Sequence, residues 1–302
     1  MSFNLIQISI ILFTVGITST SFATVFIDPK KIPNFLHGIS RYGKVVEKRE
    51  YLNKHFKLPK RYFRHFYIYT APTATMLLIL VIYAYSTCYQ LPEVLLLILD
   101  FALGSCRQAS ASPEATTLAL FLVAVHTWKR LYESCFINVF SKAKMSILIY
   151  IIAFMHYTAL LLSIVGESYG FVRGTQGTFN SNAHTWYYIT CTIIFLIADY
   201  EQFKTNKILA NLRKNKEGKV ISESYKIPKG RLFEYVSSPL QLTEIVVYLM
   251  FAAILWEATT IYFITGWVVI NQICNGIIQH EWYKKTFANY PENRKIIFPC
   301  LL

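Results

Sequence analysis

Seven apolar stretches, each about as long as a lipid bilayer is thick, constrain this chain more than any other feature. A helix needs roughly 20 mostly apolar residues to cross the hydrocarbon core of a membrane. The stretches cover residues 4–26, 66–87, 115–135, 146–166, 185–203, 239–257 and 259–280. Charged residues make up 16% of the chain, against about 25% in an ordinary soluble domain. The sequence therefore predicts an all-α membrane protein, one domain over residues 1–302 with seven transmembrane helices.

Two apolar stretches need separate interpretation. Residues 4–26 are similar to a secretory signal peptide, but no Lys or Arg precedes them and Lys30 and Lys31 follow them. We therefore expect a first span that is retained, with its N-terminus outside. Residues 91–104 are too short to span a membrane alone and contain Asp100, which favours a re-entrant or interfacial segment.

The basic residues predict how the chain is oriented. It has 30 Lys and Arg against 17 Asp and Glu, a net charge of +13. With the N-terminus outside, the inside segments are residues 27–65, 129–145, 203–231 and 281–302. These segments hold 28 of the 30 basic residues, and only Arg107 and Arg173 lie outside. Because inside loops carry an excess of Lys and Arg, topology explains the charge and no nucleic acid is needed as a partner.

Ionisable residues cluster at the predicted inner end of the third span. His126, Arg130 and Glu133 follow one another at i, i+4 and i+7, so they share one helical face. Ionisable groups at membrane depth are costly and usually face a cavity or a partner. Two alternatives stay open: Lys129 and Arg130 only set the topology with Glu133 as a local partner, and His126 is a hydrogen-bonded core residue.

A second polar face follows the fifth span. Gln202, Asn206 and Arg213 share a face if their helix continues, and donors that converge beside a Lys/Arg-rich loop suit a polyanion such as a nucleotide pyrophosphate. A solvated basic loop is the alternative. No G-x-G-x-x-G follows a strand, and G-x-x-x-x-G-K-[ST], H-E-x-x-H and G-x-S-x-G are absent, which excludes the Rossmann, P-loop and common hydrolase templates. The six cysteines are scattered without C-x-x-C, so we expect no metal site.

Several motifs, most of them in the C-terminal third, carry a family resemblance. They are LRKNK at 212–216, YKIPKGRLFEYVSSP at 225–239 and YKKTFANYPENRK at 283–295, with KRYFRHFYI at 60–68 and KRLYESCFINVFS at 129–141 upstream. Together they resemble the steroid 5α-reductase family over roughly residues 55–302. Within that family, NLRKNK and FEYVSSP are most similar to the polyprenol/polyprenal reductase branch.

The resemblance implies a fold and an activity. It implies a seven-helix enzyme of the endoplasmic reticulum membrane, with a lumenal N-terminus, a cytosolic C-terminus and a cofactor-binding region over about residues 146–302. The enzyme would take NADPH from the cytosol and reduce a polyprenyl lipid from the bilayer, polyprenal to dolichal, in dolichol synthesis for protein glycosylation. Alternatives are a steroid 4-ene-3-one 5α-reductase or a very-long-chain enoyl thioester reductase and, from other classes, a membrane methyltransferase or a transporter.

The resemblance also assigns site residues. Cofactor-binding positions fall at Arg130, Asn138, Gln202, Asn206, Arg213, Tyr225, Glu244 and Tyr283. The tyrosine that polarises the carbonyl in steroid reductases falls at Thr127, which cannot act as a comparable acid. Candidate carbonyl partners are instead His65, Tyr67 and His126. The family's usual asparagine after the S-x-P motif is Leu240, so its amide contact is missing or comes from elsewhere, with Gln241 as the neighbouring candidate.

The chemistry of the implied reaction favours an aldehyde as the direct substrate. Hydride addition to a carbon–carbon double bond needs an electron sink, and in a conjugated aldehyde the carbonyl oxygen takes the charge as an enolate. The site must then offer a hydrogen-bond donor to that oxygen in a place shielded from water. An allylic alcohol has no such sink, so we predict polyprenal, not polyprenol, as the molecule reduced.

Overall fold

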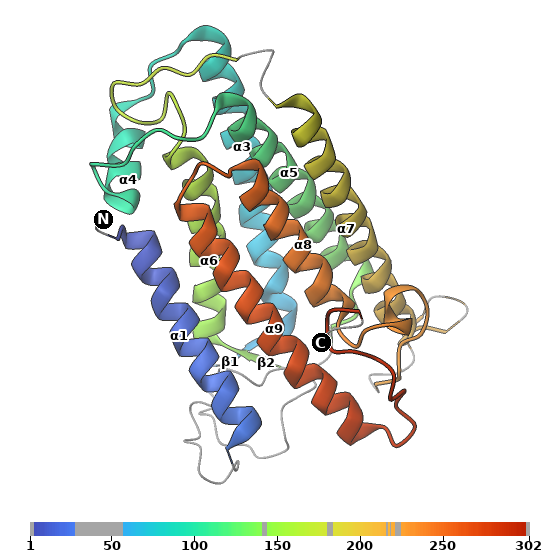
Figure 1. The fold of residues 1–302 in the computed structure, drawn as a ribbon. Coiled ribbons are helices and arrows are strands. Elements are labelled where there is room, and N and C mark those ends of the chain that lie inside the picture. Colours follow the sequence, from blue (N-terminus) through green and yellow to red (C-terminus); the bar gives the residue numbers. More distant parts are fainter. Residues whose placement is uncertain are drawn as a thin grey trace.

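The structure is a computed structural model that describes residues 3–27, 57–140, 144–179, 184–215, 217, 219–220 and 225–299. Within these ranges the chain is mostly helical, as predicted. The long helices are α1 Leu5–Phe26, α3 Arg64–Thr87, α5 Pro113–Tyr132, α6 Ile147–Gly166, α7 Thr185–Asn211, α8 Pro239–Ile254 and α9 Thr260–Thr286. Successive long helices run in alternating directions through one bundle (Figure 1).

Several short elements lie together at one end of this bundle. At the lower end of Figure 1, β1 Lys57–Pro59 pairs antiparallel with β2 Lys144–Ser146, with Leu58 opposite Met145. This two-stranded sheet corrects the all-α prediction. The turns η4 Lys60–Phe63, η5 Glu133–Ile137 and η6 Arg231–Glu234 complete the short elements. We call the end of the bundle that carries β1, β2 and residues 212–215 and 225–238 the basic end.

Four of the described helical stretches are long and apolar enough to cross a membrane. They are Leu5–Ala23, Lys60–Thr87, Ile147–Gly166 and Thr260–Thr286. The other three long helices are less suited to span a membrane alone. Helices α5 and α7 carry the charged side chains described below, and α8 has only 16 residues. Helix α4, Glu93–Leu103, has 11 residues and is too short to span, as its sequence predicted.

The predicted helix boundaries need two corrections at the basic end. Helix α7 continues to Asn211, two turns beyond the predicted end at residue 203, and α9 continues to Thr286 instead of residue 280. Arg213 lies just beyond α7, so it does not share a helical face with Gln202 and Asn206. The predicted break between the last two spans is confirmed, because α8 ends at Ile254 and α9 begins at Thr260.

Small residues bring α3 and α5 close together. Ala71 and Ala74 on α3 and Ala119 on α5 are fully buried, and these helices form one of the closest pairs in the bundle, beside α7 with α8 and α1 with α9. Between membrane helices, where hydrophobic burial drives little association, small side chains let backbones approach and gain dispersion contacts. This packing fixes the end of α5, which carries much of the site described next.

Candidate functional site

A cavity of about 390 Å³ lies at the basic end between α3, α5, α7, α8 and α9. Its lining carries four cations and five carboxamides, namely Lys60, Arg130, Arg213, Lys226, Asn138, Asn206, Gln241, Asn275 and Gln279. No carboxylate belongs to the described lining. Lys and Arg side chains without acidic competitors favour an anionic ligand, and the volume lies in the range of about 300–1,000 Å³ of small-molecule sites.

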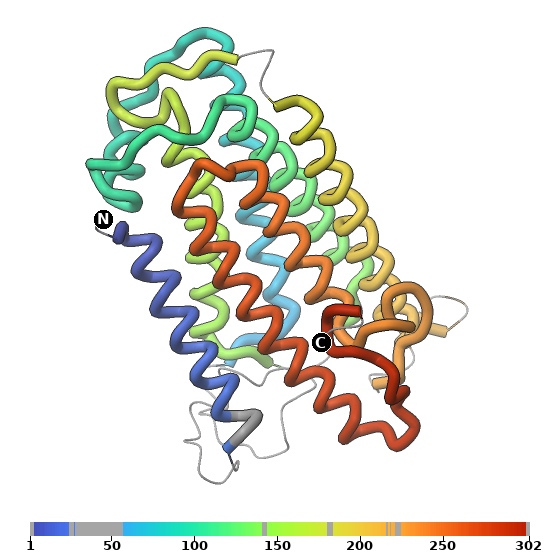
Figure 2. Tube along the Cα trace, viewed as in Figure 1, coloured from blue at the N-terminus to red at the C-terminus, as the bar shows by residue number. Residues whose placement is uncertain are grey.

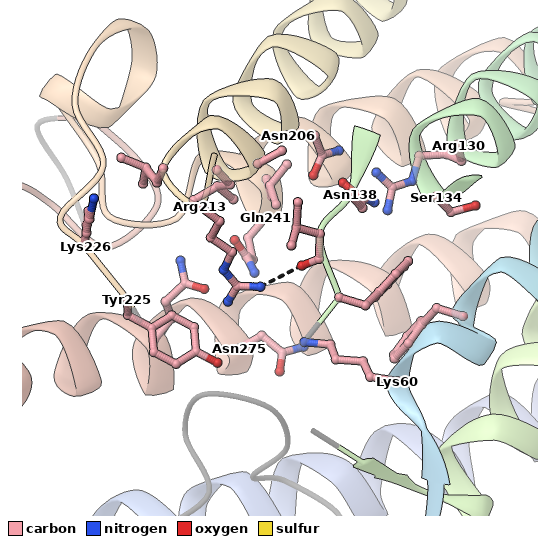
Figure 3. Close-up of a pocket in the computed structure, with 18 of the residues that line it drawn as sticks. Lys60, Arg130, Ser134, Asn138, Asn206, Arg213, Tyr225, Lys226, Gln241 and Asn275 are labelled. Atoms are coloured by element: carbon pink, nitrogen blue, oxygen red, sulfur yellow. Dashed lines mark hydrogen bonds between the residues drawn. The ribbon is translucent and has the colours of Figure 1, made fainter. Parts of the chain in front are cut away.

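The lining residues divide between two ends of the cavity. Figure 3 shows Arg130, Ser134, Asn138 and Asn206 gathered at one end, with Tyr225 and Lys226 at the other. Arg213 and Gln241 lie between the two groups (Figure 3). In the first group, Arg130 and Asn206 lie near the ends of α5 and α7, and Ser134 and Asn138 lie in and just after η5. The second group comes from the loop after α7. The cavity therefore runs from the surface loops toward the interior of the bundle. We call the end that carries Arg130, Ser134, Asn138 and Asn206 its deep end.

Arg213 is held in the middle of the cavity by a backbone carbonyl group and an aromatic ring. Its Nη1 donates to the Val139 carbonyl oxygen at 2.6 Å, and its guanidinium lies 5.1 Å from the centroid of the Tyr225 ring. Among the residues that the structure describes, Arg213 forms no ion pair. Within that part of the chain, no carboxylate balances its charge.

Arg130, by contrast, is neutralised within the protein. Its Nη1 donates to Glu133 Oε2 at 2.5 Å, and its Nε and Nη2 donate to the Tyr67 hydroxyl at 3.2 and 3.1 Å. Glu133 is fully buried and also accepts from Asn206 Nδ2 at 2.8 Å. The π-helical turn η5 begins at Glu133, and such turns are frequent at functional sites.

A closed ring of polar side chains lies behind the cavity. Asp199 Oδ1 accepts from Lys129 Nζ at 2.6 Å and lies 2.6 Å from His126 Nδ1, while Lys129 also donates to Gln202 Oε1 at 2.7 Å. Gln202 Nε2 donates to Glu244 Oε2 at 2.5 Å, and that oxygen lies 4.0 Å from His126 Nε2. The ring joins α5, α7 and α8. Paired and hydrogen-bonded groups of this kind stiffen a low-dielectric interior.

The structure brings most of the predicted site residues together. The cavity is lined by Tyr67, Arg130, Asn138, Asn206, Arg213, Tyr225 and Tyr283, and the ring contains His126, Gln202 and Glu244. His65 lies apart from both groups. Its ring stacks on Tyr62 with centroids 4.6 Å apart, and its Nδ1 lies 3.0 Å from the Tyr150 hydroxyl. Thr127 bonds back to carbonyl oxygens of its own helix.

Sequence reasoning missed five polar lining residues, Lys60, Ser134, Lys226, Asn275 and Gln279. The last two had a visible signal, because Asn275, Gln279 and Tyr283 follow one another at i, i+4 and i+8 and so share one face of α9. Gln241 lines the cavity with the side-chain amide that its neighbour Leu240 lacks. Its Oε1 is buried and has no hydrogen-bond partner among the described residues, so it is available to a ligand.

The C-terminal motifs meet in space at this site. The segment after α9 pairs with the segment before α8, since Ser237 N donates to Lys295 O at 2.8 Å and Lys295 N to Tyr235 O at 2.9 Å. Arg294 Nη1 also donates to Pro228 O at 2.9 Å. Figure 2 shows the C-terminal segment folding back beside this loop. The motifs at 225–239 and 283–295 therefore form one wall at the basic end.

Comparison with known proteins agrees with this geometry. The family model described as 3-oxo-5-alpha-steroid 4-dehydrogenase matches residues 143–302. The chain belongs to this family, the steroid 5α-reductases. It is 31% identical over 306 residues to a polyprenal reductase of Drosophila melanogaster, covering 99% of this chain and 94% of that protein. Polyprenal reductases of Caenorhabditis elegans and Homo sapiens are 32% and 29% identical, covering 87% and 86% of this chain and 86% and 84% of their own.

The family resemblance seen in the motifs is thus confirmed. As a steroid 5α-reductase family member, the protein is an oxidoreductase of carbon–carbon double bonds. Its long apolar helices make it a membrane protein. The family match begins at residue 143, yet Lys60, Tyr67, Arg130, Ser134 and Asn138 also line the cavity. The candidate site therefore depends on both halves of the chain.

Proposed function

We propose that this protein reduces the α-isoprene double bond of a polyprenal to give dolichal, with NADPH as the electron donor, in dolichol synthesis for protein glycosylation. The observation that carries the proposal is the cavity at the basic end, which is lined by cations and carboxamides without a carboxylate among its described residues. Similarity to a polyprenal reductase of Drosophila melanogaster over 99% of the chain supports the substrate. A steroid enone and a long-chain enoyl thioester are the alternative substrates.

The lining residues fit NADPH. Arg213 would bind a phosphate group, because its charge is unbalanced among the described residues and its guanidinium is fixed by Val139 and Tyr225. Arg130 is the second cation assigned to the phosphates, and its pairing with Glu133 leaves Arg213 as the stronger candidate. The unpartnered Oε1 of Gln241 would accept from an amide. Asn138, Asn206, Tyr225 and Tyr283 line the same space.

Tyr67 is the candidate carbonyl partner that the geometry favours. When bound, NADPH would provide the hydride that adds to the β carbon of the conjugated aldehyde, and a proton would later reach the α carbon. Of His65, Tyr67 and His126, only Tyr67 is among the residues that line the cavity. Its oxygen accepts two N–H groups from Arg130, and its hydroxyl also hydrogen-bonds the Tyr157 phenol. In this proposal the Tyr67 hydroxyl donates to the carbonyl oxygen, where negative charge develops.

The ring behind the cavity has a positioning role in this proposal. Glu244 is fixed by Gln202, and His126 by Asp199. Because Lys129 links Asp199 to Gln202, a change at one member shifts the others. The ring would hold the deep end of the cavity in one geometry, so that the reacting atoms stay aligned.

We also propose a single domain over residues 1–302 that crosses the endoplasmic reticulum membrane seven times, with a lumenal N-terminus and a cytosolic C-terminus. The 28 of 30 basic residues in the predicted inside segments support this topology. The cavity lies at the same end, where cytosolic NADPH would reach it. Tags added at each terminus and tested for protease access in sealed microsomes check this, and a protected C-terminus would contradict it.

The decisive experiment measures NADPH oxidation by the purified protein with polyprenal, polyprenol, a steroid enone and an enoyl thioester in parallel. We expect turnover with polyprenal and none with polyprenol freed of aldehyde. Product analysis should show the saturated aldehyde. Reduction of the steroid enone but not of polyprenal would overturn the substrate, and efficient reduction of pure polyprenol would overturn the electron-sink argument.

A further inference from the structure

A histidine that the proposed mechanism does not use lies within the bundle. His156 on α6 places its Nε2 2.7 Å from the hydroxyl of Tyr248 on α8, with the two rings 5.6 Å apart. Its other ring nitrogen, Nδ1, is buried and has no hydrogen-bond partner among the residues that the structure describes. A buried polar atom left unsatisfied in this way calls for a partner that the protein does not supply.

The bond to Tyr248 couples the tautomer of His156 to the direction in which the phenol donates. When the phenol donates to Nε2, a neutral imidazole must hold its proton on Nδ1. In that arrangement, which the proposal below adopts, His156 is a donor through Nδ1, the nitrogen that has no partner among the described residues. A ligand for this atom must offer a hydrogen-bond acceptor in surroundings that are otherwise aromatic, since Tyr157 and Phe251 pack against the pair.

The pair lies next to the deep end of the cavity. Tyr248 follows Glu244 by one turn on α8 and lies within electrostatic range of the Tyr67 phenol and the Arg130 guanidinium. Tyr157, beside His156 with ring centroids 5.2 Å apart, meets the Tyr67 ring at 5.8 Å. His156 thus lies beside the same Tyr157 ring as Tyr67, at a point farther from the basic end.

The proposed substrate has the acceptor that this site lacks. A polyprenal is a hydrocarbon with a single polar atom, its aldehyde oxygen, which must reach the reacting end of the cavity from the bilayer. We propose that His156 donates its Nδ1–H to that oxygen as a second donor beside Tyr67, and that Tyr248 is the positioning residue that holds the histidine in this tautomer. The donor stabilises the enolate as charge develops, and no proton leaves His156. This inference rests on the proposed function.

The test compares His156→Phe, His156→Gln and Tyr248→Phe with the wild-type protein in polyprenal reduction. Loss of an oxyanion donor should lower kcat on the order of 10²-fold in His156→Phe, with the KM for NADPH unchanged. His156→Gln keeps an N–H donor and should recover part of the rate. Tyr69→Phe is the matched control, because it removes a tyrosine hydroxyl that bonds Thr158 of α6 at 3.0 Å on the exposed side.

A second measurement does not depend on turnover. The carbonyl stretch of polyprenal bound to the wild-type protein should lie at lower frequency than in detergent, and His156→Phe should lose part of that shift. Equal kcat and an equal carbonyl shift in His156→Phe would overturn this inference alone. A Tyr69→Phe variant that loses as much activity would assign the effect to packing and also overturn it. Failure of the wild-type protein to reduce polyprenal would refute the proposed function and this inference with it.

Discussion

Replacing Glu133 by glutamine removes the carboxylate that forms an ion pair with Arg130. Glu133 is fully buried, and its Oε2 accepts from Arg130 at 2.5 Å and from Asn206 at 2.8 Å. Glutamine has nearly the same shape, so the substitution leaves no cavity. The change therefore isolates the electrostatic contribution of this carboxylate.

The expected cost follows from these two contacts. Hydrogen bonds to charged groups contribute about 1.5–3 kcal/mol each, and breaking a buried ion pair by removing one partner costs about 3–5 kcal/mol. A glutamine oxygen can still accept from Asn206, and the Arg130 side chain is 19% exposed, so solvent lowers the penalty. We expect Glu133→Gln to lower the free energy of unfolding by about 3 kcal/mol, a large share of the about 5–15 kcal/mol typical of a domain.

The assay is denaturant unfolding in detergent micelles, followed by tryptophan fluorescence. The double variant Arg130→Met/Glu133→Gln removes both charges and should be about 2 kcal/mol more stable than Glu133→Gln, even though it loses activity. Glu217→Gln is the matched control, since its ion pair with Lys219 is solvent-exposed. A loss below about 1 kcal/mol in Glu133→Gln, or no recovery in the double variant, would refute the view that Arg130 is left as an unpaired buried charge.

Three further predictions follow from single contacts. Arg213→Met should raise the KM for NADPH about 10- to 100-fold, as expected for a lost charge-assisted bond of about 1.5–3 kcal/mol, and an unchanged KM would contradict its phosphate role. Gln241→Leu should raise the same KM on the order of tenfold without lowering the Tm, because its Oε1 has no described protein partner; a lower Tm with an unchanged KM would contradict this. Arg173 holds the pKa of Glu93 below its usual 4.5. The stabilisation of the fold by this ion pair is therefore present above pH 4.5 and lost as the pH falls, so the Tm of Glu93→Gln should fall less on acidification than the Tm of the wild-type protein. Parallel profiles of Tm against pH for the two proteins would contradict this.

Apolar length and charge placement were enough to predict the long helices and their order, because both patterns are local. The ends of the helices were not, since α7 extends through residues 204–211, a stretch that is polar but still favourable to a helix. The β1–β2 sheet was missed for a different reason. Three-residue strands carry no periodicity, and their pairing depends on contacts between residues 57–59 and 144–146.

The site shows what spacing alone can and cannot predict. His65 and Tyr67 are two residues apart, so about 200° of helical rotation separates their side chains and they cannot both face one cavity. Helix geometry thus argues against treating them as equivalent candidates, and the structure places only Tyr67 in the lining. The ring that joins Asp199 to Lys129 and Gln202 to Glu244 connects three helices, and no spacing within one helix reveals such a contact.

The two arginines of the cavity differ in a way that bears on how a dinucleotide would lie. An unpaired charge is costly at membrane depth but tolerable near water. Arg130, at the deep end, is paired with Glu133, whereas Arg213, just beyond the end of α7, has no ion-pair partner among the described residues. The deep end is therefore nearly neutral, which suits a nicotinamide and an aldehyde, and the unbalanced charge lies toward the loops, which suits phosphates. A dinucleotide bound the other way would place its phosphates beside Glu133 and its neutral ring beside an uncompensated Arg213.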